Sequence, residues 1–149
     1  MKVKIYTDGA AVPNPGKGSY AAILFFDGNY KELVGTYRLT TNNRMEMMAV
    51  IAALESLQDK CEVTLYSDSK YVIETYTKGW KKKKNADLWG RLIPLCEKHN
   101  VNFVWVRGHD GNAGNEKCDE LAQQALKEIG QEDVGYSNPK CCKTCGRPL

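Results

Sequence analysis

Polar and apolar residues alternate along the first part of the chain in the manner of β-strands. Residues 3–8, with the sequence VKIYTD, carry a β-branched side chain at every second position, and the pattern stops at Gly9. Two further β-rich runs, Tyr20 to Phe26 and Glu32 to Leu39, are separated by Asp27-Gly28-Asn29. An Asp-Gly pair between two such runs is typical of a hairpin. The first three strands are therefore predicted to form an antiparallel meander.

The spacing of apolar residues changes to a helical period after residue 43. The positions that set this period are Met47, Val50, Ile51, Leu54 and Leu57. Asn42 or Asn43 is available to cap the start of this helix. Strand and helix patterns then alternate, with strands over residues 62–68 and 101–106 and helices over about 69–76, 87–99 and 118–129. This order predicts an α/β domain in which helices cover a mixed sheet.

Length and composition fit one globular domain. The chain has 149 residues, of which 42% are apolar and 26% are charged. A chain of this size buries roughly 69% of its unfolded surface. The longest uninterrupted apolar run, Met47 to Leu54, has eight residues, and the first residues, MKVKIYTDG, contain no apolar signal segment. We therefore predict no membrane span, no export signal and a cytoplasmic protein.

The cysteines separate a body from a tail. Three lie singly in the body of the chain. The other three crowd its end, at Cys141, Cys142 and Cys145. This usage favours a reduced protein over a disulfide framework. Structural zinc needs four ligands, but only these three cysteines lie close together in the tail. A flexible or oxidised tail is therefore favoured over a zinc site. We predict one domain over residues 1–130 and a Cys-containing tail over 131–149, with Cys118 as a core residue of the last helix.

Positive charge is concentrated in one short segment. The net charge is only +3, but a group of lysines falls within seven residues, at Lys78, Lys81, Lys82, Lys83 and Lys84. One interpretation is a solvated loop. Trp80 supports a second interpretation, a surface that binds single-stranded nucleic acid. An indole between ammonium groups offers a stacking face for a base beside counter-charges for phosphates. On this segment alone, both interpretations stay open.

Four carboxylates stand where a charge is costly or well placed for a ligand. Asp8 and Asp68 are each predicted at the carboxyl end of a strand, the edge where open α/β sheets bind ligands. Either side chain could instead hydrogen-bond to the backbone of the adjacent turn or cap a helix. Glu46 shares a helical face with Val50 and is directed toward the sheet, where a charge needs a partner. Asp119 is predicted early in the last helix, where it could also act on the helix dipole.

A convergence of these four side chains would require cations. Two carboxylates 4 Å apart repel by about 4 kcal/mol at an effective dielectric constant of 20. Oxygen donors alone favour Mg²⁺ or Mn²⁺, and two such ions about 4 Å apart can stabilise the attacking and leaving oxygens of a phosphodiester displacement. The residues therefore indicate a metal-dependent nuclease. His109, on a Gly-rich loop, is either the proton carrier of such a reaction or an ordinary exposed histidine.

Five short motifs, taken in order, resemble the bacterial type 1 ribonuclease H family. They are YTDG from residue 6, TTNNRME from residue 40, YSDS from residue 66, VRGH from residue 106 and NEKCDELA from residue 115. The resemblance spans about residues 2–129. It implies a five-stranded mixed sheet, with a meander of three strands followed by two parallel strands.

The family resemblance also implies an activity and a site. The catalytic and metal-binding residues would be Asp8, Glu46, Asp68 and Asp119, with His109 assisting turnover. The family cuts the RNA strand of RNA–DNA hybrids with two Mg²⁺ ions, or Mn²⁺ as a substitute, and leaves 5′-phosphate and 3′-hydroxyl ends. We expect a monomer.

Further residues are placed against the substrate by the same resemblance. Asn14, Asn43 and Glu46 would lie near the RNA groove. Thr41 and Asn85 would lie near a phosphate of the DNA strand, with Trp80 beside that strand. Longer members carry a basic protrusion that shrinks here to residues 79–85. We expect weaker, more salt-sensitive hybrid binding, with the loss partly offset by the four lysines Lys81, Lys82, Lys83 and Lys84.

Two other functions remain open. A catalytically idle nucleic-acid-binding module would keep the Lys-Trp segment without a working site, but the four intact acidic positions argue against it. A related sheet nuclease, such as a junction resolvase or a transposase-like domain, is disfavoured by the TTNNRME segment.

Overall fold

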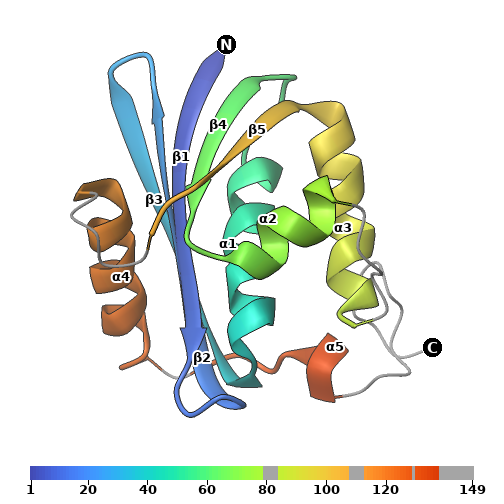
Figure 1. The fold of residues 1–149 in the computed structure, drawn as a ribbon. Helices are drawn as coiled ribbons and strands as arrows, with labels where there is room; N and C mark the ends of the chain where they lie inside the picture. The colour runs from blue at the N-terminus through green and yellow to red at the C-terminus, as the bar shows by residue number, and fades with distance from the viewer. Residues whose placement is uncertain (79–83, 108–112, 129, 138–149) are drawn as a thin grey trace.

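The structure is a computed structural model that describes residues 1–78, 84–107, 113–128 and 130–137. The strands are β1 (Lys2–Ala11), β2 (Gly16–Phe26), β3 (Asn29–Thr40), β4 (Glu62–Ser67) and β5 (Asn100–Trp105). The helices are α1 (Asn42–Glu55), α2 (Lys70–Thr77), α3 (Ala86–Lys98), α4 (Ala113–Ala125) and the short α5 (Val134–Ser137) (Figure 1). From β1 to α4, the element order is the one that the periodicity predicts.

The strands form one sheet in the order β3-β2-β1-β4-β5. β1, β2 and β3 pair antiparallel, whereas β4 pairs parallel with β1 and β5 parallel with β4. In the turn between β2 and β3, Asp27 and Gly28 have positive φ angles of 48° and 75°. A two-residue hairpin turn of this kind requires such angles, and Asp-Gly adopts them readily. The predicted five-stranded mixed sheet of an α/β domain is confirmed.

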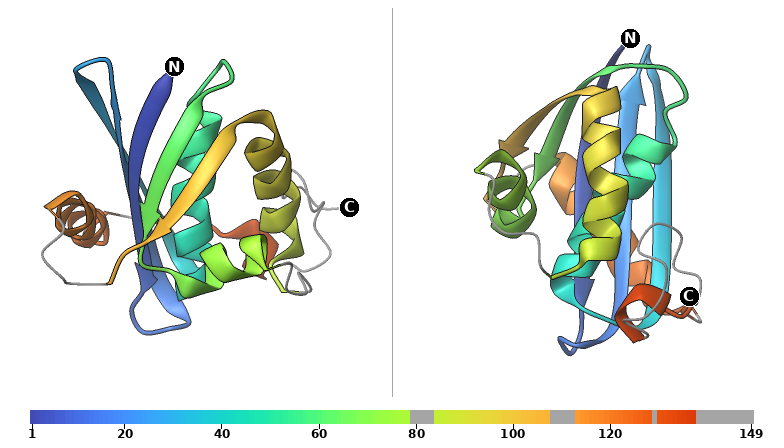
Figure 2. Two further views of the ribbon diagram at one scale, coloured as in Figure 1. Left: turned by 45° about the horizontal axis from the view of Figure 1, so that its top comes forward. Right: turned by 90° about the vertical axis from the view of Figure 1, so that its right-hand side faces the viewer.

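Helices cover both faces of the sheet. α1, α2 and α3 lie on one side and α4 lies on the other (Figures 1 and 2). α1 is buried over most of its surface, and its Ile51 and Leu54 belong to one apolar cluster with Ile5 of β1 and Leu65 of β4. Each such side chain contributes about 1.5–3 kcal/mol when fully buried. A smaller cluster under α4 consists of Ala21, Ile23, Cys118 and Ala122. Cys118 is therefore a core residue, as predicted.

β1 continues past the point where the sequence pattern predicts its end. It does not stop at Gly9 but pairs with β2 as far as Ala11, opposite Gly18. Packing explains this glycine, because a Cβ at Gly9 would lie 2.4 Å from the carbonyl carbon of Met45 in α1. The prediction that Asp8 ends its strand is therefore wrong. Asp8 lies within β1, and Gly9 lets α1 approach the strand closely.

Two details of the helices also differ from the predictions. α1 is capped by Thr41, whose Oγ1 accepts a hydrogen bond from the Arg44 amide at 3.2 Å, rather than by Asn42 or Asn43. Asp119 lies in the middle of α4 and not early in it. Because the dipole effect is confined to the first turn, it does not explain a carboxylate at this position.

After α4 the chain returns to the sheet. The Gln131 amide donates to the Thr36 carbonyl oxygen, and the Gln131 carbonyl oxygen accepts from the Arg38 amide, both at 2.8 Å. Asp133 is buried, with 8% of its surface exposed. The predicted domain boundary at residue 130 thus lies directly before a stretch that packs on the body of the protein.

The cysteines of the body are buried thiols. Cys61, Cys96 and Cys118 are free, while the tail cysteines lie outside the described residues. None of the helices in the described part of the chain is long and apolar enough to cross a bilayer.

A carboxylate cluster as candidate metal centre

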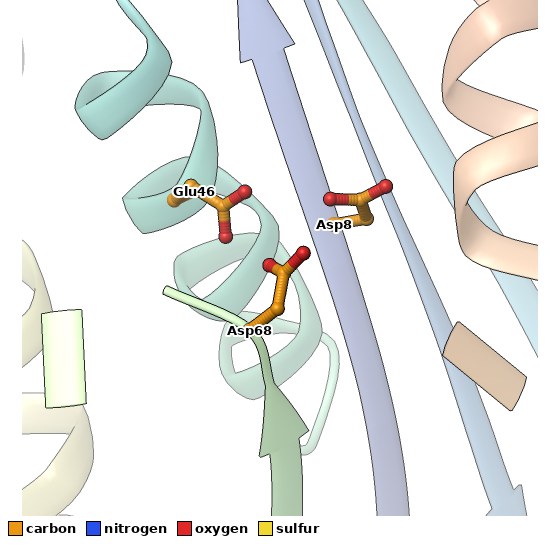
Figure 3. Close-up of side chains that lie close together, drawn as sticks. All are labelled: Asp8, Glu46 and Asp68. Atoms are coloured by element: carbon orange, nitrogen blue, oxygen red, sulfur yellow. The ribbon is translucent and has the colours of Figure 1, made fainter. Parts of the chain in front are cut away.

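Two of the acidic side chains come from neighbouring parallel strands. β1 and β4 pair in register as far as Tyr6 and Tyr66, so that Asp8 and Asp68 each follow the last pair by two residues. Because positions two residues apart share a face in an extended chain, the two carboxylates lie close together at this end of the strand pair (Figure 3).

The third carboxylate, that of Glu46, reaches the same point from the beginning of α1 (Figure 3). The Gly9 amide donates to Asp8 Oδ1 at 2.9 Å and to Glu46 Oε1 at 3.2 Å. This shared donor is possible because Gly9 has no side chain to keep α1 away. One oxygen from each of Asp8, Glu46 and Asp68 lies within 4.8 Å of the other two.

The surroundings of these carboxylates oppose their negative charge. Burial, followed by the charges of Asp68 and Asp119, raises the pKa of Asp8 to about 7. Burial, followed by the charges of Asp68 and Asp8, raises the pKa of Glu46 well above its usual value. Among the described residues, Glu46 Oε2 has no hydrogen-bond partner. A buried acceptor without a donor costs about 1–3 kcal/mol, so a bound cation would stabilise this cluster.

The donor set fits a hard divalent ion. The ligand atoms that converge in the described part of the chain are carboxylate oxygens, without a thiolate or an imidazole. Mg²⁺ and Mn²⁺ prefer oxygen ligands, whereas zinc sites in proteins commonly include nitrogen or sulfur. The cluster can therefore hold Mg²⁺ or Mn²⁺ through one oxygen from each carboxylate.

A cavity of about 400 Å³ opens over the cluster. Its walls include Asp8, Glu46, Asp68 and Asp119. Asp119, from α4, stands outside the group of three, although its charge raises the pKa of Asp8. Asp119 Oδ2 accepts a hydrogen bond from Gln123 Nε2 at 2.9 Å. The structure thus brings all four predicted carboxylates to one cavity and three of them to one point.

Known proteins match this chain over nearly its whole length. The family model described as RNase H matches residues 1–127. A Ribonuclease H of Rippkaea orientalis is 52% identical over 152 aligned positions, which cover 92% of this chain and 93% of that protein. The chain belongs to the ribonuclease H family.

Solved structures of ribonucleases H share the fold. RNase H1 from the archaeon Halobacterium salinarum is 29% identical with a TM-score of 0.73, and the match covers 87% of this chain and 100% of that one. LC11-RNase H1, solved in complex with RNA/DNA hybrid, is 27% identical with a TM-score of 0.69 and covers 84% and 96% of the two chains. The family resemblance predicted from the five motifs is confirmed.

Of the residues predicted to contact the substrate of a ribonuclease H, Asn43 and Glu46 line this cavity. Asn14 Oδ1 accepts a hydrogen bond from the Asn42 amide at 3.1 Å, and Thr41 caps α1. Lys84 is exposed. The remaining predicted residues, Trp80, Lys81, Lys82, Lys83 and His109, lie outside the described residues.

The sequence did not reveal a second polar cluster beside the cavity. Arg44, 3% exposed, forms ion pairs of 2.6 Å with Asp87 and 2.8 Å with Asp133. Its guanidinium also donates to Oδ1 of Asn85 at 3.3 Å. The one signal in the sequence is an arginine in a helix whose following apolar positions, Met45, Met47 and Met48, are buried.

Proposed function

We propose that the chain is an endoribonuclease that hydrolyses the RNA strand of RNA–DNA hybrids by a two-metal-ion mechanism, leaving 5′-phosphate and 3′-hydroxyl ends. The observation that carries the proposal is the approach of Asp8, Glu46 and Asp68 to within 4.8 Å in a chain of the ribonuclease H family. The hybrid bound to LC11-RNase H1 supports the substrate class. We propose Mg²⁺ as the ion, Mn²⁺ as its substitute, and a monomeric enzyme.

The metal ligands in this proposal are Asp8, Glu46, Asp68 and Asp119. Ions held there would supply positive charge to the attacking and leaving oxygens of the scissile phosphodiester. The carboxylates of Asp8 and Glu46 are fixed by their shared donor, the Gly9 amide. Ligands that are already in place reduce the reorganisation needed when charge develops in the transition state.

Protons are exchanged at two places in the proposed reaction. We assign protonation of the leaving group to His109, because an imidazole titrates near neutral pH. The carboxylates must lose their protons to bind a metal ion. Because the pKa of Asp8 is raised to about 7, metal affinity and cleavage are expected to rise with pH through the neutral range.

Substrate binding is assigned to residues around the cavity. On the RNA side we propose Asn14, Asn43 and Glu46, and on the DNA side Thr41 and Asn85. Short hydroxyl and amide groups suit this role, because they donate to phosphate or bond a 2′-hydroxyl without ordering a long side chain. Additional non-specific attraction to the DNA strand is assigned to Trp80, Lys81, Lys82, Lys83 and Lys84.

The proposal is tested with three labelled substrates, an RNA–DNA hybrid, duplex DNA and duplex RNA, each incubated with Mg²⁺ and with chelator. We expect cutting of the hybrid alone, only with Mg²⁺, and products with 5′-phosphate ends. The variant Asp68→Asn should lose this activity. Asp59→Asn, the same substitution at an exposed position before β4, should retain it.

Other outcomes would identify other functions. Binding of the hybrid without cutting, at any metal concentration, would indicate an idle binding module and contradict the proposal. Cutting of duplex DNA would indicate a sheet nuclease with a different substrate. Full activity of Asp68→Asn would refute the assignment of the metal site.

A further inference from the structure

Asn85, proposed above to contact a phosphate of the DNA strand, is held at both ends of its side-chain amide. It precedes α3 in the left-handed conformation, with a φ of 59°, and its side chain does not cap the helix. Asn85 Oδ1 accepts a hydrogen bond from Arg44 Nη1 at 3.3 Å. Asn85 Nδ2 donates to the Tyr71 hydroxyl oxygen at 3.1 Å. The amide is thus oriented before any substrate arrives.

The guanidinium of Arg44 has five N–H donors, and the structure uses all of them. Nε and Nη2 donate to the two oxygens of Asp133, both at 2.8 Å. Nη1 and Nη2 donate to the two oxygens of Asp87 at 2.8 and 2.6 Å, and the remaining Nη1 hydrogen goes to Asn85. Two bidentate pairs fix both the position and the plane of the guanidinium.

These contacts determine which end of the Asn85 amide is available to a ligand. A guanidinium only donates, so Arg44 can hold the amide oxygen but not the amide nitrogen. The Tyr71 hydroxyl oxygen accepts from Asn85 Nδ2 and also from Trp89 Nε1 at 3.3 Å. One of the two Nδ2 hydrogens is therefore used by Tyr71, and the second can be donated to a phosphate. A rotated amide would instead turn its oxygen toward the phosphate, which needs a donor.

We propose that Arg44 is a positioning residue for hybrid binding: held by Asp87 and Asp133, it keeps the Asn85 amide turned so that Nδ2 donates to a phosphate of the DNA strand. The proposal rests on the proposed function and extends it. It gives the stretch 131–136 a part in substrate binding, because Asp133 comes from that stretch, 89 residues after Arg44. Gly135 keeps the stretch close, since a Cβ there would lie 2.7 Å from Arg44 Nη2.

Two variants change these contacts while nearly preserving shape. Arg44→Lys keeps a positive charge, but an ammonium cannot form two bidentate pairs and also reach Asn85. Asp133→Asn replaces one carboxylate oxygen by an NH₂ group. This group is itself a donor, so it cannot accept a hydrogen bond from Arg44. The matched control is Arg91→Lys. Arg91 pairs with Glu55 at 2.8 Å between α3 and α1 and does not line the cavity over the carboxylates.

The experiment uses hybrids in which one phosphate of the DNA strand at a time is replaced by a neutral methylphosphonate. In the wild type, we expect one position at which the replacement raises KM by about tenfold or more, the loss of a hydrogen bond to a charged group. On unmodified hybrid, Arg44→Lys and Asp133→Asn should show a KM raised by about tenfold for the same lost contact, with kcat nearly unchanged. Both variants should then be almost insensitive to the methylphosphonate, whereas Arg91→Lys should behave as the wild type.

Each alternative gives a different result. A purely structural role of Arg44 would lower the amount of folded enzyme but leave the response to methylphosphonate intact, and that result in a folded variant contradicts the proposal. Folding is checked by circular dichroism, and the isosteric Asp133→Asn decides if Arg44→Lys does not fold. A wild type that cuts the hybrid but responds to no methylphosphonate would overturn this inference and leave the proposed function standing. A wild type that does not cut the hybrid would overturn the proposed function itself.

Discussion

Two groups of carboxylates meet α1 within a few residues of each other, one at Arg44 and the other at Glu46, and they differ in what balances their charge. Asp87 and Asp133 share the guanidinium of Arg44. Burial alone would raise the pKa of Asp87, but the hydrogen bonds and charge of Arg44 hold that pKa below its usual value. In the cavity the effects act together instead, because burial and the neighbouring carboxylates both raise the pKa values of Asp8 and Glu46.

The difference between the two groups follows from what each must do. A guanidinium is a permanent partner that fixes two segments of chain against α1. A divalent ion can bind the carboxylates and still keep positions open for water or for a substrate phosphate. The fold therefore completes the structural cluster of Arg44, Asp87 and Asp133 with its own cation. The carboxylates of the cavity would instead be balanced by the divalent ion proposed above. Arg44 and Glu46, two residues apart, serve these clusters from different sides of α1.

The largest effect is expected from a change in the cavity. Asp68→Asn removes a proposed metal ligand and its charge. Loss of several kcal/mol of transition-state stabilisation corresponds to a fall in kcat of about a thousandfold or more. The fold should remain, because the substitution also reduces repulsion. Single-turnover cleavage with saturating Mg²⁺ measures the effect. A fall of less than about tenfold would show that Asp68 is not essential to the metal site.

A substitution in the structural cluster should lower the stability of the fold. Asp133→Ala leaves the buried guanidinium with one carboxylate, and we expect the free energy of unfolding to fall by about 3–5 kcal/mol, with or without Mg²⁺. The exposed pair offers the control: Arg91→Ala, which breaks the contact with Glu55, should cost less than about 1 kcal/mol. Urea denaturation measures both. Equal losses in the two variants would contradict the contrast between buried and exposed ion pairs.

Metal binding should stabilise the wild type. At a Mg²⁺ concentration of about 100 times Kd, the free energy of unfolding should rise by about 2.7 kcal/mol. The same rise is expected in Arg91→Ala and a much smaller one in Asp68→Asn. Thermal denaturation with and without Mg²⁺ provides the measurement. An undiminished rise in Asp68→Asn would place the stabilising ion somewhere other than the cavity.

The smallest expected effect is a pH-dependent gain from Asp8→Asn in the absence of metal. The folded-state pKa of Asp8 is raised from 3.8 to about 7, so the favourable contribution of its protonated form is complete below about pH 4 and is lost as the pH rises through 7. Asn avoids this loss. The variant should therefore gain on the wild type between pH 4 and 7. The full shift of one isolated group would give roughly 4 kcal/mol. Because Glu46 interacts with Asp8 and shares part of this shift, we expect a gain of the order of 1–2 kcal/mol above pH 7. Urea denaturation in chelator at several pH values tests this, and a difference that does not change with pH would contradict it.

Local sequence was sufficient for most of the fold. The hairpin at Asp27-Gly28 and the helix after residue 43 are determined by neighbours along the chain, which periodicity records. The role of Gly9 is not local, because it depends on the approach of Met45 from α1. A glycine at the end of an alternating run is typical of a turn, and this explains why β1 was predicted too short.

The two clusters differ in how far they could be predicted. Asp8, Glu46 and Asp68 stand in family motifs, and their expected convergence is seen in the structure. The partners of Arg44 lie 43 and 89 residues further along the chain. No periodic pattern links such positions, and Asp133 follows the predicted domain boundary. Ion pairs between distant segments depend on the assembled fold, so the sequence alone did not show this network.

Anomalous diffraction from crystals soaked in Mn²⁺ tests most directly whether the carboxylates of the cavity form a divalent-ion site. We expect an anomalous peak among Asp8, Glu46 and Asp68, roughly 2.0–2.3 Å from one oxygen of each, and no peak beside Asp87 and Asp133. A cavity without a peak at a Mn²⁺ concentration that supports cleavage, or a peak only at another place, would contradict it.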